Sequence, residues 1–171
     1  MNTKILETKY QLPTYEKLPL IITRGEGAYV WDEKGTKYLD FYGGHAVALI
    51  GHCHQKLINA VSKQMKTLIF YSNVVYNKQR AQAAKQLVAA AGKTFSSVFF
   101  CNSGSEANET ALKLAKKFTG KDEVISFSGS FHGRTLGSLS VTGFDKYKKH
   151  VGSLMHNVVF CELNDIKGVK K

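Results

Sequence analysis

Apolar residues recur at the spacing of an α-helix in three stretches of the chain. Residues 55–69 and 78–91 each place apolar side chains on one face, and Gly92 directly follows the second stretch. The third stretch covers residues 107–118 and is followed by Gly120, where glycine most easily adopts the left-handed backbone that ends a helix. The pattern therefore predicts three amphipathic helices.

Shorter apolar runs predict strands elsewhere. Residues 21–41 form short alternating runs broken by glycine-containing turns, which is typical of a β-meander. Residues 1–19 contain both prolines and are interpreted as an irregular arm, and residues 143–157 as a basic, exposed connection. Four further runs are candidate strands: 98–100, 124–127, 136–142 and 158–160. Strands that alternate with helices predict an α/β fold with a mostly parallel sheet flanked by helices.

The first candidate binding site lies where the run at 98–100 leads into the third helix. Ser103 and Glu106 have the spacing of a capping box, which satisfies amide groups at a helix start. A helix start also carries free N–H groups and the positive end of the helix dipole, so the turn at Ser103–Ser105 predicts a seat for a phosphate. The alternative is that the small residues only turn the chain and cap the helix.

A second loop follows the run at 124–127 and carries Phe131, His132 and Arg134. Parallel strands joined by a helix open at the same edge of a sheet, which is the usual place for a ligand in such folds. One loop would then hold a phosphate while the other supplies an aromatic face and a fixed cation.

These residues resemble a known family. The segments 102–109 (NSGSEANE) and 131–135 (FHGRT) closely resemble the class III aminotransferases, which use pyridoxal phosphate and share the fold of aspartate aminotransferase, called fold type I. The segments 51–54, 139–143 and 164–165 resemble the same family. Within the family, the chain is most similar to the acetylornithine and ornithine aminotransferases, from about Leu20 onwards.

The resemblance implies a role for each residue that matches the family motifs. Gly104 and Ser105 would hold the cofactor phosphate through backbone N–H and hydroxyl groups. Phe131 would stack on the cofactor ring, although packing in a core is the commoner fate of a phenylalanine. Arg134 would pair with a substrate carboxylate, a planar two-point match that lysine cannot reproduce.

The resemblance also implies the organisation of the protein and its reaction. Residues 1–50, the arm and the meander, would belong to a small domain, and residues 51–171 would form the first part of the large domain that binds pyridoxal phosphate. An amino group would pass from N-acetylornithine or a related ω-amino acid to the 2-oxo acid 2-oxoglutarate, in arginine biosynthesis. Ornithine, succinylornithine and 4-aminobutyrate are alternative substrates, and the full-length protein would be a homodimer.

The catalytic lysine of the family is expected beyond the C-terminus of this chain. That lysine forms a Schiff base with the cofactor, and it and the acidic partner of the pyridine nitrogen lie downstream of the matched segment. None of the 21 lysines lies in the family's lysine context. The chain is thus expected to be an N-terminal fragment that is inactive alone. A non-catalytic module, or a heteromer subunit that retains only a phosphate-binding turn, is the alternative.

Composition narrows the possible partners. At 171 residues with 43% apolar content, the chain is about one domain long and is expected to bury a sizeable core. The net charge of +11 comes from scattered lysines, with only three arginines, which argues against a nucleic-acid partner. No apolar run approaches membrane-spanning length and no signal-peptide core is present, so a cytoplasmic location away from membranes is expected. Three widely spaced cysteines argue against a disulfide framework.

A cluster of histidines and one cysteine raises the question of a metal. His45, His52, Cys53 and His54 are all zinc-ligand types, but the last three are consecutive, so their side chains diverge, and no second ligand pair lies at finger spacing. We expect no metal and interpret the segment as a loop that braces the entrance of an active site.

The resemblance places the aromatic loop at 70–77 near the active site and dimer interface; the alternative is that its rings only pack.

Overall fold

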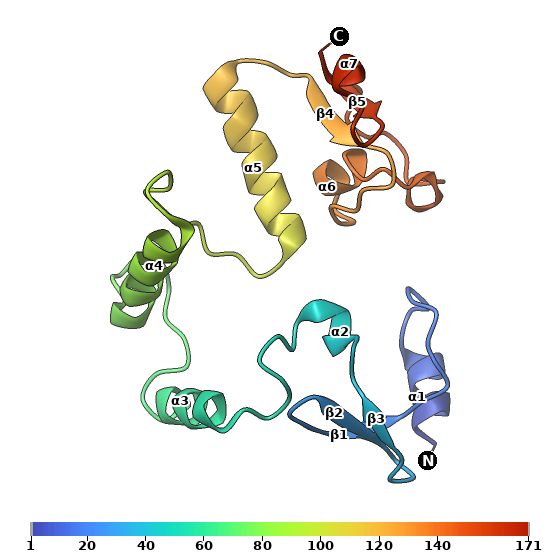
Figure 1. The fold of residues 1–171 in the computed structure, drawn as a ribbon, viewed down its shortest axis with the longest axis vertical. Helices are drawn as coiled ribbons and strands as arrows, with labels where there is room; N and C mark the ends of the chain where they lie inside the picture. The colour runs from blue at the N-terminus through green and yellow to red at the C-terminus, as the bar shows by residue number, and fades with distance from the viewer. Residues whose placement is uncertain (1, 171) are drawn as a thin grey trace. The chain divides into compact units, whose positions relative to one another are not determined.

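The computed structural model describes residues 2–170, which divide into two compact units. The boundary between the units falls between Tyr76 and Asn77. Figure 1 shows the elements of each unit along the chain. Among the described residues, no helix is both long and apolar enough to cross a membrane.

The first unit contains the predicted β-meander. Strands β1 (Ile22–Glu26), β2 (Tyr29–Asp32) and β3 (Lys37–Leu39) pair in antiparallel order, with Gly25 opposite Val30 and Val30 opposite Tyr38. Asp32 holds the turn between β2 and β3, because its carboxylate accepts hydrogen bonds from the N–H groups of Lys34 and Thr36 and from the Tyr38 hydroxyl. Local hydrogen bonds thus define the meander, as its glycine turns predict.

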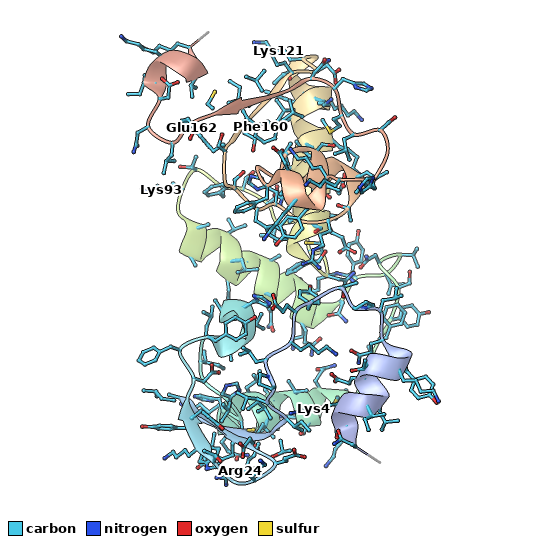
Figure 2. All side chains as sticks on the ribbon, turned by 90° about the vertical axis from the view of Figure 1, so that its right-hand side faces the viewer. Lys4, Arg24, Lys93, Lys121, Phe160 and Glu162 are labelled. Atoms are coloured by element: carbon cyan, nitrogen blue, oxygen red, sulfur yellow. The ribbon has the colours of Figure 1, made fainter. Side chains whose placement is uncertain are left out.

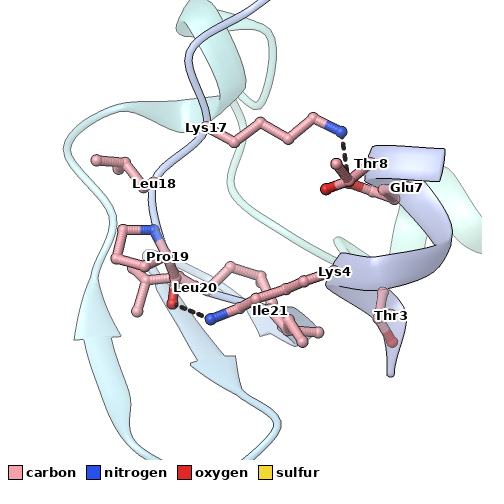
Figure 3. Close-up of a pocket in the computed structure, with 10 residues that line it drawn as sticks. Thr3, Lys4, Glu7, Thr8, Lys17, Leu18, Pro19, Leu20 and Ile21 are labelled. Atoms are coloured by element: carbon pink, nitrogen blue, oxygen red, sulfur yellow. Dashed lines mark hydrogen bonds and ion pairs between the residues drawn. The ribbon is translucent and has the colours of Figure 1, made fainter. Parts of the chain in front are cut away.

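Residues 3–10 form helix α1 (Thr3–Tyr10), so the prediction of an irregular arm is wrong for this segment. The Asn2 side chain accepts a hydrogen bond from the Lys4 N–H and caps the helix, and both prolines come later in the chain. Lys4 donates a hydrogen bond to the Pro19 carbonyl, 2.8 Å away, and Lys17 pairs with Glu7 at 2.6 Å. Figure 3 shows both contacts beside a cavity of about 320 Å³.

The segment between the meander and helix α3 (Gln55–Met65) is held to the sheet by His52. The backbone of His52 pairs with Gly27, and its ring lies 2.7 Å from the Asp40 carboxylate. The hydrogen bond from His52 is the main cause that holds the pKa of Asp40 below its usual value, and the N–H of Gly43 adds to it. The short helix α2 (Gly43–Ala46) lies between these anchors, and α3 ends four residues before the predicted limit at Ile69.

The second unit combines helices with a parallel sheet. Its helices are α4 (Lys78–Ala91), α5 (Gly104–Thr119), α6 (Leu136–Ser140), the 3₁₀ helix η1 (Asp145–Tyr147) and α7 (Ile166–Val169). Strands β4 (Val124–Phe127) and β5 (Val158–Cys161) pair in parallel, with Ser126 opposite Phe160. In Figure 1, α5 leads into β4 and α6 lies beside α5. The described part of the chain is therefore α/β, with helices beside a parallel strand pair.

Two predicted strands of the second unit are absent. Residues 98–100 form no strand, because a strand needs a partner for its backbone groups and none of the described residues supplies one. Residues 136–140 form helix α6 instead of a strand. The N–H groups of Gly137 and Ser138, at the start of α6, donate to the side chain of Glu109 on α5, a contact that no local pattern reveals.

The core is small, which contradicts the expectation drawn from apolar content. Within residues 2–170 the buried apolar side chains are Leu139, Val141 and Cys161, around α6 and β5, and the polar Ser138 and Thr142 beside them are fully buried. Many large apolar side chains are exposed, among them Phe160 of β5, which is labelled in Figure 2. Composition shows only how many apolar residues a chain contains. Their burial also requires other helices or strands that pack against them, and the described elements leave many apolar faces uncovered.

Candidate functional site

Helix α5 begins at a side-chain cap, as predicted. The Ser103 hydroxyl accepts a hydrogen bond from the Glu106 N–H at 3.2 Å. In a capping box the side chain of the third helical residue also accepts a hydrogen bond from the N–H of the capping residue. Here the Glu106 carboxylate accepts instead from the N–H of the preceding residue, Asn102, at 2.6 Å, so this second bond is shifted by one residue. At the other end, Gly120 adopts the predicted left-handed conformation, with φ of 67°.

The first turn of α5 presents hydrogen-bond donors. The N–H groups of Gly104 and Ser105 donate to no acceptor among residues 2–170, and the Ser105 side chain is half-buried. Gly104 has no side chain, so a ligand could approach the backbone closely. Two N–H groups and a hydroxyl at the positive end of a helix of 16 residues match the donors that a phosphate needs. The described residues therefore fit a phosphate group.

Gly133 brings the second predicted loop against this turn. Its backbone has φ of 129°, and a Cβ at this position would overlap the Ser105 hydroxyl and lie 3.1 Å from the Ser138 Cβ. The Ser138 hydroxyl also donates a hydrogen bond to the Ser105 carbonyl, at 3.1 Å. The structure thus places Ser105 next to the loop that carries Phe131 and Arg134.

Buried polar side chains fix the path of this loop. The Asn108 amide of α5 donates to the His132 carbonyl at 2.6 Å, and the His132 N–H donates to the Thr142 hydroxyl at 3.0 Å. The Thr142 hydroxyl lies 3.2 Å from the Gly133 carbonyl and 3.0 Å from that of Ser138. Because Thr142 is fully buried, its hydrogen bonds hold the backbone of the loop at His132 and Gly133 against the core.

Glu109 links α5 to α6 through a carboxylate at a helix start. Its Oε1 accepts hydrogen bonds from Gly137 N–H at 2.9 Å and Ser138 N–H at 3.2 Å. The Thr135 hydroxyl is the largest influence on the pKa of Glu109 and lowers it; burial opposes this, and the two N–H groups lower the pKa further. Glu109 therefore remains ionised at neutral pH and stabilises the start of α6.

Phe131 and Arg134 both lie near one aromatic ring, that of Tyr147. The Phe131 and Tyr147 ring centroids are 5.8 Å apart with an interplanar angle of 69°, and Arg134 Cζ lies 5.6 Å from the Tyr147 centroid. The side chain of Phe131 is 53% exposed, which leaves ring surface for a ligand. Sequence reasoning missed Tyr147, since a tyrosine in a lysine-rich connection has no spacing that relates it to the loop.

The site thus combines donors for a phosphate, an aromatic ring and a guanidinium within one unit. Phosphate donors come from α5, and the ring and the cation come from the loop after β4. Such a set can hold a phosphorylated planar ring together with a carboxylate ligand, and none of its members is by itself an acid, base or nucleophile suited to neutral pH. The described arrangement is therefore suited to holding and orienting such a ligand.

Within the histidine and cysteine segment, one histidine makes a contact that holds the fold. His52 is engaged with Asp40, and within residues 2–170 no group of three or more histidine, cysteine, aspartate or glutamate side chains is arranged to hold a metal ion. Cys53 and Cys101 are exposed thiols and Cys161 is a buried one. The aromatic residues of the loop at 70–77 are mostly exposed, and its placement at an active site or dimer interface stays a prediction.

Comparison with known proteins gives one consistent family. The model of the family described as "Aminotransferase class-III" matches residues 10–171. The chain is 43% identical over 171 residues to an acetylornithine aminotransferase of Methanopyrus kandleri, covering 100% of this chain and 44% of that protein. It is 46% identical over 144 residues to the acetylornithine aminotransferase of Methanothermobacter thermautotrophicus, covering 84% of this chain and 36% of that protein.

Solved structures agree with the sequence matches. An ornithine aminotransferase from Toxoplasma gondii superposes with a TM-score of 0.90 at 25% identity, over 98% of this chain and 41% of that one. An omega transaminase from Pseudomonas jessenii in complex with PMP superposes with a TM-score of 0.85 at 32% identity, over 94% of this chain and 39% of that one. The chain thus spans less than half the length of the proteins that it matches.

Proposed function

The chain belongs to the class III aminotransferases, and we propose that it carries the phosphate-binding and carboxylate-binding parts of an aminotransferase that uses pyridoxal 5'-phosphate. The proposed amino donor is N-acetylornithine or a related ω-amino acid, and the proposed acceptor is 2-oxoglutarate. The names of the relatives support this choice, because acetylornithine aminotransferases match the chain at 43% and 46% identity.

The observation that carries the proposal is the contact between Ser105 and Gly133. This contact brings the start of α5 and the loop that bears Phe131 and Arg134 to one place. Two separate motifs, far apart in the chain, then act on one ligand rather than on two. The TM-score of 0.85 to a transaminase in complex with PMP adds support.

In the proposed mechanism, pyridoxal phosphate supplies an electron sink for the carbon from which the amino acid loses its proton. The N–H groups of Gly104 and Ser105 and the Ser105 hydroxyl would bind its phosphate. Phe131 would cover one face of its ring and keep water from that face. Arg134 would bind a substrate carboxylate through two parallel N–H bonds and so orient the amino acid.

We propose that residues 1–171 do not catalyse transamination by themselves. The reaction needs a lysine and an acidic residue beside the pyridine nitrogen, and the relatives have more than half of their length outside the matched part. Lys146, whose Nζ lies 4.9 Å from the Tyr147 centroid, is a cation beside the loop, and we give it no catalytic role.

The proposal includes the setting of the protein. Residues 1–50 would belong to the small domain and residues 51–171 to the large domain, a division distinct from the two compact units that separate after Tyr76. The complete enzyme would be a cytoplasmic homodimer without nucleic-acid or membrane partners.

A binding and labelling experiment tests this function. Pyridoxal phosphate added to the 171-residue chain should bind weakly and reversibly, in competition with inorganic phosphate. Ser105→Ala should weaken binding, by about two- to tenfold for a lost phosphate donor. Ser128→Ala, which removes the hydroxyl of an exposed serine, is the matched control and should bind like the wild type.

Borohydride reduction followed by peptide mass spectrometry completes the test. We expect low labelling spread over several lysines, because no lysine of this chain is assigned to the cofactor. One lysine that carries a full equivalent of pyridoxyl group would contradict the proposal that the catalytic lysine is absent. Binding that Ser105→Ala leaves unchanged would contradict the assigned phosphate site.

A further inference from the structure

Tyr147 lies beside the two side chains that we assign to the cofactor ring and to the substrate carboxylate. Its ring meets Phe131 edge to face, with centroids 5.8 Å apart, and the Arg134 guanidinium lies 5.6 Å from the same centroid. Both distances fall in the range where aromatic pairs and cation–π pairs attract. The Tyr147 ring therefore contacts both Phe131 and Arg134 in the loop after β4.

The Tyr147 ring is itself held in place. Its backbone N–H donates to the Phe144 carbonyl at 3.2 Å, within the turn that forms η1. The Phe144 ring packs against it edge to face, with centroids 6.1 Å apart and an interplanar angle of 86°. Tyr147 is half-buried, so neighbouring protein atoms occupy part of the space into which its ring could turn. A restrained ring can restrain what it touches.

Arg134 needs such restraint for its proposed role. An arginine side chain has many rotamers available to it, and a two-point contact with a carboxylate requires one orientation of the guanidinium plane. A ring face beside the guanidinium removes part of this freedom before the ligand arrives, which improves affinity by pre-organisation. Lys146 Nζ lies 4.9 Å from the same ring, so two cations flank it, and an anionic ligand is favoured there.

We propose that Tyr147 is a positioning residue of the site, whose ring sets the orientation of Arg134 toward the carboxylate and supports Phe131 from its edge. This inference rests on the function proposed for Arg134 and goes beyond it, because it assigns a role to a residue outside both loops. The ring, and not the hydroxyl, carries the role.

Arginine modification tests the proposal without a loaded cofactor. Phenylglyoxal modifies guanidinium groups, and the chain has only three arginines, so peptide mass spectrometry can follow Arg134 beside Arg24 and Arg80 in one sample. With 2-oxoglutarate as the probe, Arg134 should be protected in a saturable manner while Arg24, which lies over the Trp31 ring, is not. The concentration for half protection measures carboxylate binding.

Variants of Tyr147 give the decisive comparison. Tyr147→Phe keeps the ring and should retain the wild-type half-protection concentration. Tyr147→Leu removes the ring and should raise this concentration about two- to fivefold, the range of one exposed cation–π contact. Phe160→Leu is the matched control, because it removes another exposed ring of the same unit that lies under a cation, that of Lys148 at 4.0 Å, and leaves the Tyr147 ring in place. Tyr147→Met replaces the Leu variant if circular dichroism shows that Tyr147→Leu is unfolded.

The outcomes separate this inference from the proposed function. No protection of Arg134 in the wild type would overturn the carboxylate role of Arg134 and this inference with it. Protection that is equal in the wild type and Tyr147→Leu would overturn the inference alone. A half-protection concentration raised as much by Phe160→Leu as by Tyr147→Leu would also overturn it, since any lost ring would then have the same effect. The same rise in Tyr147→Phe would overturn it too, since it would indicate a role for the hydroxyl.

Discussion

Gly133 is a single position on which the geometry of the binding loop depends. A side chain there meets both an unfavourable φ of 129° and the Ser105 hydroxyl. Gly133→Ala should therefore move the loop away from α5, with a loss of about 1–3 kcal/mol in the free energy of unfolding and weaker binding of pyridoxal phosphate. Urea unfolding and a cofactor titration measure the two effects.

Gly129→Ala is the control that separates strain from steric overlap. Gly129 also has a positive φ, of 73°, but a Cβ there has no atom within 4 Å. This variant should lose about 1 kcal/mol from backbone strain alone and bind the cofactor normally. If both variants bind equally well, the contact between Gly133 and Ser105 does not shape the site.

At the scale of elements, Glu109 couples α5 to α6, and this coupling should depend on pH. The folded state holds the pKa of Glu109 below its unfolded value, mainly through Thr135, so Glu109 contributes stability at pH values above about 4.5, and this contribution disappears as the pH falls through the lower folded pKa. Glu109→Gln should lower the free energy of unfolding by about 1–2 kcal/mol at pH 7, because charge-assisted bonds to the start of α6 are lost.

Urea unfolding at pH 7 and at pH 3 measures this contribution. The difference in the free energy of unfolding between wild type and Glu109→Gln should shrink at pH 3. Asp32, Asp40 and Asp122 also have lowered pKa values, so their protonation at low pH destabilises both proteins by the same amount and does not change the difference. Glu123→Gln, at an exposed position, should show no difference at either pH. A difference for Glu109 that stays constant between the two pH values would show that its charge has no part in the coupling.

At the scale of the whole molecule, uncovered apolar surface should drive association. The β4–β5 pair has no further strand within residues 2–170, residues 98–100 are unpaired, and a cavity of about 410 Å³ lies between α5 and β4. Phe99 is 62% exposed. Parallel sheets are usually covered on both faces, so an uncovered face is a surface on which another chain can pack. An unpaired strand edge can form backbone hydrogen bonds with another chain. The isolated chain should be oligomeric or poorly soluble.

Sedimentation velocity at two salt concentrations checks this expectation. The net charge of +11 opposes association, and added salt screens that repulsion, so oligomers should increase between about 0.05 and 0.5 M salt. A compact monomer that unfolds cooperatively in calorimetry at both concentrations would contradict the expectation. It would favour the non-catalytic, stand-alone module over a part of a larger enzyme.

Features that depend on nearby residues could be predicted from the sequence. Helix α4 spans the predicted residues 78–91, the meander has its predicted order, and Ser103 and Gly120 bound α5 as their chemistry requires. Caps, glycine turns and amphipathic spacing act over a few residues, so the local pattern contains the information. The motifs around Gly104 and Phe131 indicated the family for the same reason.

Features that depend on residues far apart in the chain could be seen only in the folded protein. Residues 136–140 are helical because Glu109 on α5 caps them, and the β-prone run at 98–100 forms no strand because no described segment pairs with it. Tyr147 reaches Phe131 and Arg134 only through the path of the connection after α6. Contacts of this kind depend on how the elements pack in space. A hydrophobic pattern in the sequence indicates that a face is apolar, but it does not indicate which segment will cover that face.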